Sequence, residues 1–244
     1  MNMLERFRER AGECNMPDAA IEYWVGIARP CLCLRTDGEG PVVGHFGGKP
    51  ALPESVAWPA GHAHLASLDL AAIPKGATDL DLPAEGTLVF MAVPGSASAA
   101  GRVIYAPTGV ALTEAEPPGD GVSEYTRTPL HGVLDWSMPE DAYRSPRYMQ
   151  DGQRDDEDLF EEITWELEDS DSLLILGGFG FSNTGGLGVP VREHEELLAE
   201  FFLQENEVGE DFETDYTTVF YVVARDDLTA RNFDAVWMAA DFHG

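Results

Sequence analysis

Residues 217–224 read Thr-Thr-Val-Phe-Tyr-Val-Val-Ala, and they are the strongest strand signal in the chain. β-Branched and aromatic residues fill almost every position, as is typical of strands. Because both alternating faces are largely apolar, the segment is expected to be a central strand that is covered on both sides. A sheet therefore decides the fold class.

Shorter apolar runs on the N-terminal side and one run on the C-terminal side extend this pattern. Gly and Pro, which number 25 and 16, bound these runs and favour many short elements over a few long helices. We expect a mainly β (α+β) fold with antiparallel or mixed sheets and a few short helices. The expected strands are 31–35, 64–70, 87–93, 102–106, 122–127, 173–176 and 233–240, with 195–203 as strand or helix; the expected helices are 3–13, 18–28 and 139–150; and 38–48 is expected to be a turn-rich connection.

Two parts of the chain share a local pattern. Phe-Gly-Gly at 46–48 and Leu-Gly-Gly at 176–178 are each followed by two apolar strand candidates, at an offset of 130 residues at the glycines. The offset favours pseudo-repeated halves, 30–130 and 170–244, within one domain that spans 1–244. Chance similarity is the alternative, because strand patterns carry little information.

Composition excludes several classes of protein. Hydrophobic residues make up 44% of the 244 residues, which is enough for a core and excludes a chain that is disordered throughout. The 44 acids and 15 bases give a net charge of −29, which argues against nucleic acid or an anionic membrane as partner. No apolar run reaches the length of a membrane span, and residues 1–10 lack the apolar segment of a secretory signal. We therefore expect a cytoplasmic protein.

The segment after the first glycine pair carries a family resemblance. It comprises Phe46-Gly47-Gly48-Lys49-Pro50-Ala51-Leu52-Pro53, then Trp58-Pro59, the strand candidate 65–70, and Leu82-Pro83-Ala84-Glu85-Gly86-Thr87-Leu88-Val89-Phe90. Together with Asp-Asp-Leu-Thr-Ala-Arg-Asn-Phe-Asp at 226–234, these residues resemble the YwqG-like family of bacterial proteins. Two features depart from the family: Ser67 replaces a usual Gln, and a usual Trp-Gly-Asp-x-Gly is reduced at 211–216. The resemblance implies a mainly β architecture of related halves and implies no activity.

The residue types of this segment indicate a scaffold. Glycine pairs permit positive φ or close backbone approach, prolines hold an extended path, and a tryptophan adds a large apolar anchor. The interpretation is an ordered structural loop that caps the open end of a sheet, with a rigid binding rim as the alternative. The residues assigned to this role are Gly47, Gly48, Pro50, Pro53, Trp58, Gly177 and Gly178.

Catalytic and metal motifs are weak. His62 and His64 would share one face of an extended segment, but a metal site needs three or four convergent ligands with support around them. Cys31 and Cys33 fit buried thiols, and no phosphate-binding or dinucleotide motif exists, so no metal or other cofactor is expected. A carboxylate- or metal-dependent enzyme with a pocket near His62 and His64 remains the alternative function.

Acidic segments are the most unusual feature of the chain. Residues 151–172 contain 11 acids and one base, and residues 193–215 contain 10 acids and neither Lys nor Arg. We interpret them as a docking face for a basic protein, in a non-catalytic binding module that is immunity- or antitoxin-like or regulatory. A solvated surface that favours solubility is the other reading. The partner-binding residues assigned to this face are Asp155, Asp156, Glu157, Asp158, Glu205 and Glu207.

Overall fold

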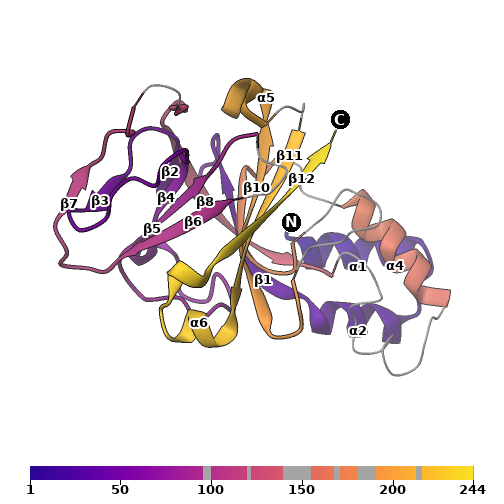
Figure 1. Ribbon diagram of the computed structural model, residues 1–244. Helices are drawn as coiled ribbons and strands as arrows, with labels where there is room; N and C mark the ends of the chain where they lie inside the picture. Colours follow the sequence, from indigo (N-terminus) through magenta and orange to yellow (C-terminus); the bar gives the residue numbers. More distant parts are fainter. Residues whose placement is uncertain are drawn as a thin grey trace.

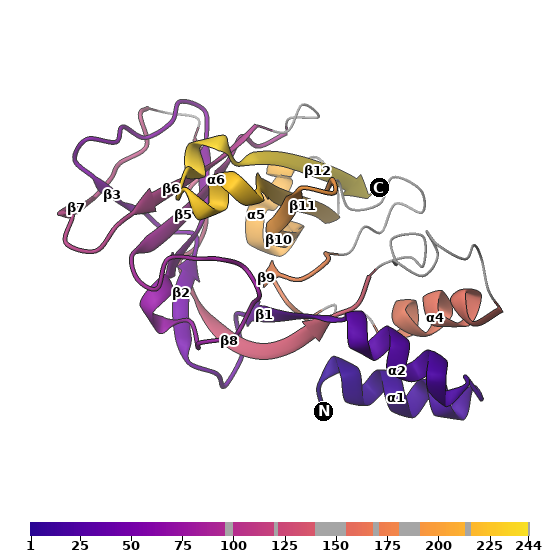
Figure 2. The ribbon, with the colours of Figure 1, turned by 90° about the horizontal axis from the view of Figure 1, so that it is seen from below.

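A nearly closed antiparallel sheet dominates the computed structural model (Figures 1 and 2), which describes residues 1–95, 100–119, 122–139, 155–167, 171–180, 191–212 and 216–243. The mainly β prediction is therefore confirmed. The strands are β1 (Arg29–Arg35), β2 (Val42–Phe46), β3 (Ala51–Pro53), β4 (Ala63–Asp69), β5 (Thr87–Ala92), β6 (Gly101–Ala106), β7 (Leu112–Glu114), β8 (Thr128–Ser137), β9 (Leu174–Gly177), β10 (Glu195–Gln204), β11 (Tyr216–Ala224) and β12 (Trp237–His243).

Short helices surround the sheet. The α-helices of the described residues are α1 (Met3–Glu13), α2 (Asp18–Ile27), α4 (Asp155–Glu166), α5 (Glu205–Val208) and α6 (Arg225–Thr229), and the 3-10 turns are η1 (Leu70–Ala72), η3 (Gly209–Phe212) and η4 (Phe233–Ala235). In this part of the chain no helix is long and apolar enough to cross a membrane.

The strand order of the large sheet is β12-β11-β10-β9-β1-β8-β2-β4-β5-β6. Strands β1 and β8 pair in the middle, and the chain leaves this pair outward on each side in sequence order. The second strand on each side contains a β-bulge, at Leu65 in β4 and at Leu198 in β10, and β2 has a further irregularity at Val43. The next residues then face Phe90 and Tyr221, through the register pairs Ala66 with Phe90 and Ala199 with Tyr221.

Aromatic rings fill the interior that the curled sheet encloses. Phe90, Phe201 and Tyr221 are buried and contact one another edge to face, with ring centroids 5.1–5.6 Å apart. The outer strands β6 and β12 approach each other closely, since a Cβ on Gly101 would lie 2.5 Å from the sulfur of Met238. Glycine at this position lets the two edges of the sheet meet.

A second core lies between α1, α2 and α4, which form a layer beside the sheet (Figure 2). Trp24 of α2 stacks on Phe160 of α4 at 3.9 Å, and Phe7 of α1 meets Phe160 edge to face. The layer is tied to the sheet where the backbone N–H of Met3 donates to Asp135 of β8 over 2.6 Å.

Two local predictions from the sequence are wrong. Residues 122–127 form no strand although they are rich in β-formers, and the strand starts instead at Thr128. The strand β8 is not recognisable from periodicity, because Pro129 and Gly132 interrupt its apolar pattern. The expected connection at 38–48 contains β2, a short strand with Gly44 at its centre, which makes it resemble a turn in the sequence. The expected helix at 139–150 lies almost wholly outside the described residues.

Candidate functional site

The proline-rich loop is a structural cover. Its first part forms β3, which pairs with β7 as a separate two-stranded sheet and includes Pro53. Trp58 is half-buried, packs against the cluster of Leu52, Val89 and Met91, and donates from its indole N–H to the carbonyl of His62 at 2.7 Å. The loop therefore covers the outer face of β5, and its tryptophan is an anchor that keeps one edge in water.

Both glycine pairs adopt left-handed backbone conformations. Gly47 and Gly48 have φ of 58° and 68°, and Gly177 and Gly178 have φ of 75° and 82°. At Gly47 the conformation coincides with close approach, because an added Cβ would lie 2.5 Å from the carbonyl oxygen of Thr126. Gly47 thus requires glycine for two independent reasons.

His62 and His64 do not form a shared site. His64 is buried, and its ring nitrogens lie 2.9 Å from the carbonyl oxygen of Gly48 and 2.9 Å from the hydroxyl of Ser67. His62 is half-exposed and contacts the carbonyl of Ala60. Among the described residues no group of three or more His, Cys, Asp or Glu side chains is arranged to hold a metal ion.

Burial governs the chemistry of the His64–Ser67 pair. Desolvation lowers the pKa of His64 to about 4, and the nearby His45, whose ring centroid is 5.5 Å away, lowers it further. The pKa of His45 is lowered as well, again chiefly by burial. A serine next to a neutral imidazole has the composition of a nucleophile and base. The burial of both side chains, however, keeps a substrate away from the hydroxyl in this conformation.

The acids assigned to partner binding are dispersed. On α4, Asp158 is exposed, Asp156 accepts a hydrogen bond from the Trp24 indole, and Glu157 is only 2% exposed. The side chain of Asp155 lies outside the described set. Glu205 and Glu207 belong to α5, which lies apart from α4 in both views of the molecule (Figures 1 and 2).

The acids on α5 differ in their roles. Glu205 is exposed, whereas the carboxylate of Glu207 accepts the backbone N–H of Gln204 at 3.0 Å and so helps to cap the helix. Burial raises the pKa of Glu207. Only part of the assigned set therefore presents negative charge to a partner, and the set does not make one continuous surface.

An outward face of α4 combines acids with an aromatic side chain. Asp158, Glu162 and Trp165 are exposed and follow each other at helical spacing. Trp165 is 56% exposed, while Phe160 and Ile163 on the opposite face are buried in the helical core. Farther along the helix, Glu166 is paired with Arg10 of α1 at 2.7 Å. We call Asp158, Glu162 and Trp165 the α4 face.

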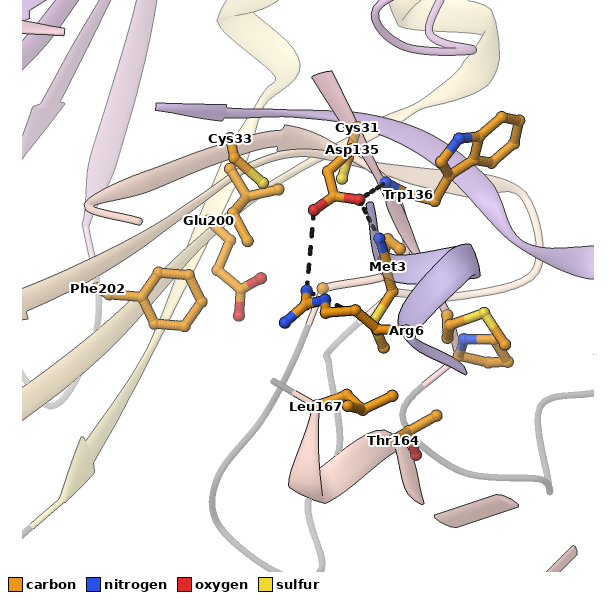
Figure 3. A pocket seen from close by; sticks show the side chains of 15 residues that line it. Met3, Arg6, Cys31, Cys33, Asp135, Trp136, Thr164, Leu167, Glu200 and Phe202 are labelled. Atoms are coloured by element: carbon orange, nitrogen blue, oxygen red, sulfur yellow. Dashed lines mark hydrogen bonds and ion pairs between the residues drawn. The ribbon is translucent and has the colours of Figure 1, made fainter. Parts of the chain in front are cut away.

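A cavity of about 80 Å³ lies between the sheet and the helical layer (Figure 3). Arg6 of α1, Asp135 of β8 and Glu200 of β10 converge on it. Cys31 and Cys33 of β1 line its sheet side, and neither takes part in a disulfide. The apolar lining comes from Met3, Trp136, Met138, Pro139, Leu167, Ile175 and Phe202.

The charged groups of this cavity are held in different ways. One oxygen of Asp135 accepts two backbone N–H groups, from Met3 and Trp136, and the other lies 3.9 Å from a guanidinium nitrogen of Arg6. The Nε atom of Arg6 is buried without a hydrogen-bond partner. Glu200 is fully buried, with 0% of its surface exposed. The cavity thus gathers a partly exposed guanidinium, the carboxylate that it faces and a second, fully buried carboxylate.

Sequence reasoning missed this cavity. Its charged residues lie at positions 6, 135 and 200, so no spacing motif links them. The only local signal was the alternation of Cys31 and Cys33, which correctly places both thiols on one face of a strand. Glu200 belongs to the acid-rich segment 193–215, but its neighbours Ala199 and Phe201 are apolar, and this local contrast is the signal that sets it apart from the other acids.

Comparison with known proteins gives one family. A family model described as Domain of unknown function (DUF1963) matches residues 44–241. The match begins in β2 and ends in β12, so it contains both outer parts of the sheet and α4, whereas α1, α2 and β1 precede it. No curated protein matches the sequence.

Proposed function

Because the chain belongs to the DUF1963 family, whose description assigns no activity, we propose from its surface that it is a non-catalytic protein-binding module. Its partner is a basic protein, and the α4 face is the docking surface. The observation that carries this proposal is Trp165, which is 56% exposed on a helix whose outward side is otherwise acidic. An immunity-like or regulatory role fits such a binder.

The chemistry of the α4 face supports this assignment. Exposed tryptophans are enriched among the residues that contribute most to binding energy in protein interfaces. Glu162 and Asp158 precede Trp165 by about one and two turns of the helix and add negative charge to the same face. Such charges attract a positive partner over distances near the Debye length, and thereby raise the association rate. The net charge of −29 extends this attraction to the whole molecule.

Charge neutralisation on the α4 face is the first test. A partner is captured from the native host with the wild-type protein, and its association is then measured at several salt concentrations. Asp158→Asn combined with Glu162→Gln should lower the association rate about tenfold at low salt and flatten its salt dependence. Trp165→Ala should instead raise the dissociation rate, since it removes apolar contact area.

Glu54→Gln combined with Glu114→Gln is the matched control, because it removes two exposed charges near the small β3–β7 sheet, away from α4 (Figure 1). The control should leave the association rate within about twofold of wild type. If both double variants slow association equally, net charge alone acts and α4 is not the docking surface. If Trp165→Ala leaves the dissociation rate unchanged, the proposal is wrong.

The enzymatic alternative has less support. It required His62 and His64 to share a pocket with carboxylates, whereas His64 contacts Ser67 and Gly48 and His62 contacts Ala60. A binding function needs no such convergence.

We also propose that the two sides of the sheet are related halves of a YwqG-like fold. The bulges at Leu65 and Leu198, each on the second strand outward from β1 and β8, and the positive-φ glycine pairs support this relation. Superposing residues 46–93 on residues 176–223 tests it. Failure of β5 to superpose on β11 with Phe90 on Tyr221 would contradict it.

A cytoplasmic location is proposed on the basis of the cysteines. Cys14, Cys31 and Cys33 are not in disulfide bonds, as is usual for thiols in a reducing compartment. Fractionation of the native host with an antibody against the protein tests this location, and recovery in the periplasmic or secreted fraction would contradict it.

A further inference from the structure

We propose that the loop between η1 and β5 is a strap that opens while the sheet stays folded, and that two arginine clasps hold it closed. The strap comprises residues 73–85. The clasps are the ion pairs of Asp79 with Arg29 and of Asp81 with Arg231. This device is separate from the α4 face and does not depend on a protein partner.

Both ends of the strap are fixed at one base. The backbone N–H of Leu70 donates to the carbonyl of Gly86 at 2.9 Å, and the hydroxyl of Tyr105 donates to the carbonyl of Glu85 at 3.1 Å. Gly86 has φ of 108°, in the region that glycine adopts without strain. A compact loop whose ends are joined in this way can move as a unit about its base.

The middle of the strap is lightly attached to the molecule. In the described part of the chain, its backbone–backbone hydrogen bonds stay within residues 70–86. Ala77 is its one buried residue, while its leucines and its isoleucine are half-buried against the main core. Where the strap meets the sheet, a Cβ on Gly177 would lie 3.1 Å from the Cβ of Thr78. Segments with so few buried apolar contacts open locally at a lower free-energy cost than the whole domain.

The first clasp has a second acceptor behind it. Arg29 of β1 makes two hydrogen bonds to the exposed Asp79, at 2.6 and 3.0 Å. The same guanidinium donates to Glu196 of β10 at 2.6 Å and lies 5.5 Å from the ring centroid of Phe179. When Asp79 moves into water, Arg29 keeps both of these partners. Opening therefore leaves no half-buried charge unpaired, which would otherwise be a large part of its cost.

The second clasp is built in the same way. Arg231, which follows α6, donates to the backbone carbonyl of Asp81 and, at 3.1 Å, to its carboxylate. It also donates to the carbonyl of Leu228 at 3.1 Å, and this bond does not involve the strap. The φ of Arg231 is 60°, at a helix end where glycine is the usual residue. An arginine in this strained conformation is explained by what its side chain holds, which is the strap.

Thiol labelling of a residue under the strap tests the proposal on the full chain. Ala77→Cys in a Cys14→Ser background is the reporter, because Ala77 is buried when the strap is closed. Cys31 and Cys33 are buried in β1 without a disulfide, so they report on opening of the sheet in the same molecule. Mass spectrometry after a pulse of iodoacetamide gives the labelling rate at each position.

The introduced thiol should be labelled at least about tenfold faster than Cys31 and Cys33, because the strap opens without the sheet. Raising the salt concentration from about 0.01 M to about 0.5 M should increase its rate about threefold, since salt screens the exposed clasps. If Ala77→Cys lowers Tm, Thr78→Cys serves as the reporter, because it is close in size to the native residue and half-buried. Equal labelling rates at the reporter, Cys31 and Cys33 would overturn the proposal.

Variants of the clasps identify what holds the strap closed. Asp79→Asn combined with Asp81→Asn should raise the labelling rate of the reporter about fivefold and remove most of its salt dependence, while the rates of Cys31 and Cys33 stay unchanged. Glu85→Gln is the matched control, because it removes a charge from an exposed side chain of the same strap that neither clasp uses. Its labelling rate should stay within about twofold of the parent reporter. A double variant that labels no faster than the Glu85→Gln control would contradict the clasps.

Discussion

The hydroxyl of Tyr221 donates a hydrogen bond to the backbone carbonyl of Met91 across 2.9 Å, inside the sheet. Tyr221 lies on β11 and Met91 on β5, which belong to opposite sides of the ten-stranded order. Met91 faces His64 next to the bulge of β4. The bond therefore joins the two sides of the sheet at a point where the regular ladder is interrupted.

Removal of this hydroxyl should be costly for its size. Tyr221→Phe keeps the ring contacts with Phe90 and Phe201 but leaves the carbonyl of Met91 without this donor. We expect a loss of about 1–2 kcal/mol in the free energy of unfolding, measured by urea denaturation. Tyr105→Phe removes a similar bond, to Glu85, at an exposed position, and should cost under about 0.5 kcal/mol. Equal costs for the two variants would contradict the structural role of Tyr221.

Backbone conformation predicts a large effect at the first glycine pair. Gly47→Ala combines a positive φ with a Cβ that would lie 2.5 Å from the Thr126 carbonyl oxygen, so it should cost more than about 2 kcal/mol in chemical denaturation. Gly61→Ala is the control, since Gly61 has φ of 73° and open space around it. It should cost only about 1 kcal/mol. A smaller loss at Gly47 than at Gly61 would show that the backbone adjusts at Thr126.

Hydrophobic periodicity predicted the strands whose apolar pattern is not interrupted by Pro or Gly. The run at 217–224 became β11, between β10 and β12, because nearly all of its residues suit a strand covered on both sides. In contrast, β8 contains Pro129 and Gly132, which look like breakers in isolation. Pro129 is tolerated because it lies near the start of the strand, and Gly132 because its missing side chain makes room for Leu32 and Val43. These reasons are tertiary and are absent from local sequence.

Of the two candidate surfaces, the acid-rich α4 segment is visible in the local sequence, whereas the cavity is not. Exposure of acids on α4 follows helical spacing, but the sequence alone did not separate the exposed Asp158 from the buried Glu157, because it showed no partner helices for α4. The cavity depends on contacts among α1, β8 and β10, which only the folded topology brings together. Neighbouring charges in space, rather than in sequence, define it.

Truncation of Trp58 should destabilise the protein less than truncation of a fully buried ring. Truncation of a fully buried large aromatic side chain to Ala lowers the free energy of unfolding by about 3–5 kcal/mol. Because Trp58 is only half-buried, Trp58→Ala should lower it by about 2 kcal/mol. Trp58→Phe should cost about 1 kcal/mol, chiefly through the lost hydrogen bond to His62. The exposed Trp165→Ala is the control and should change stability by less than about 0.5 kcal/mol in urea denaturation. A cost for Trp58→Ala no larger than this control would show that the loop is not anchored by Trp58.

Stability should depend on pH through His64. Burial lowers the pKa of His64 from its ordinary value of 6.5 to about 4, and His45 shifts in the same direction. Between these two values the unfolded chain binds the proton and the folded chain does not, so stability falls as pH drops from about 6.5 to about 4. The full difference corresponds to about 3 kcal/mol.

The comparison of wild type with His64→Gln isolates this contribution, because the many carboxylates titrate in both proteins. The free energy of unfolding is measured in urea at pH 7, 6, 5 and 4.5, and the difference between the two proteins is plotted against pH. Gln retains hydrogen-bonding groups for Gly48 and Ser67 but takes up no proton. The excess of the wild-type free energy of unfolding over that of the variant should therefore shrink steadily below pH 6.5. NMR titration gives an independent reading: a ring of His64 that protonates near pH 6.5 in the folded protein would contradict its burial as the cause.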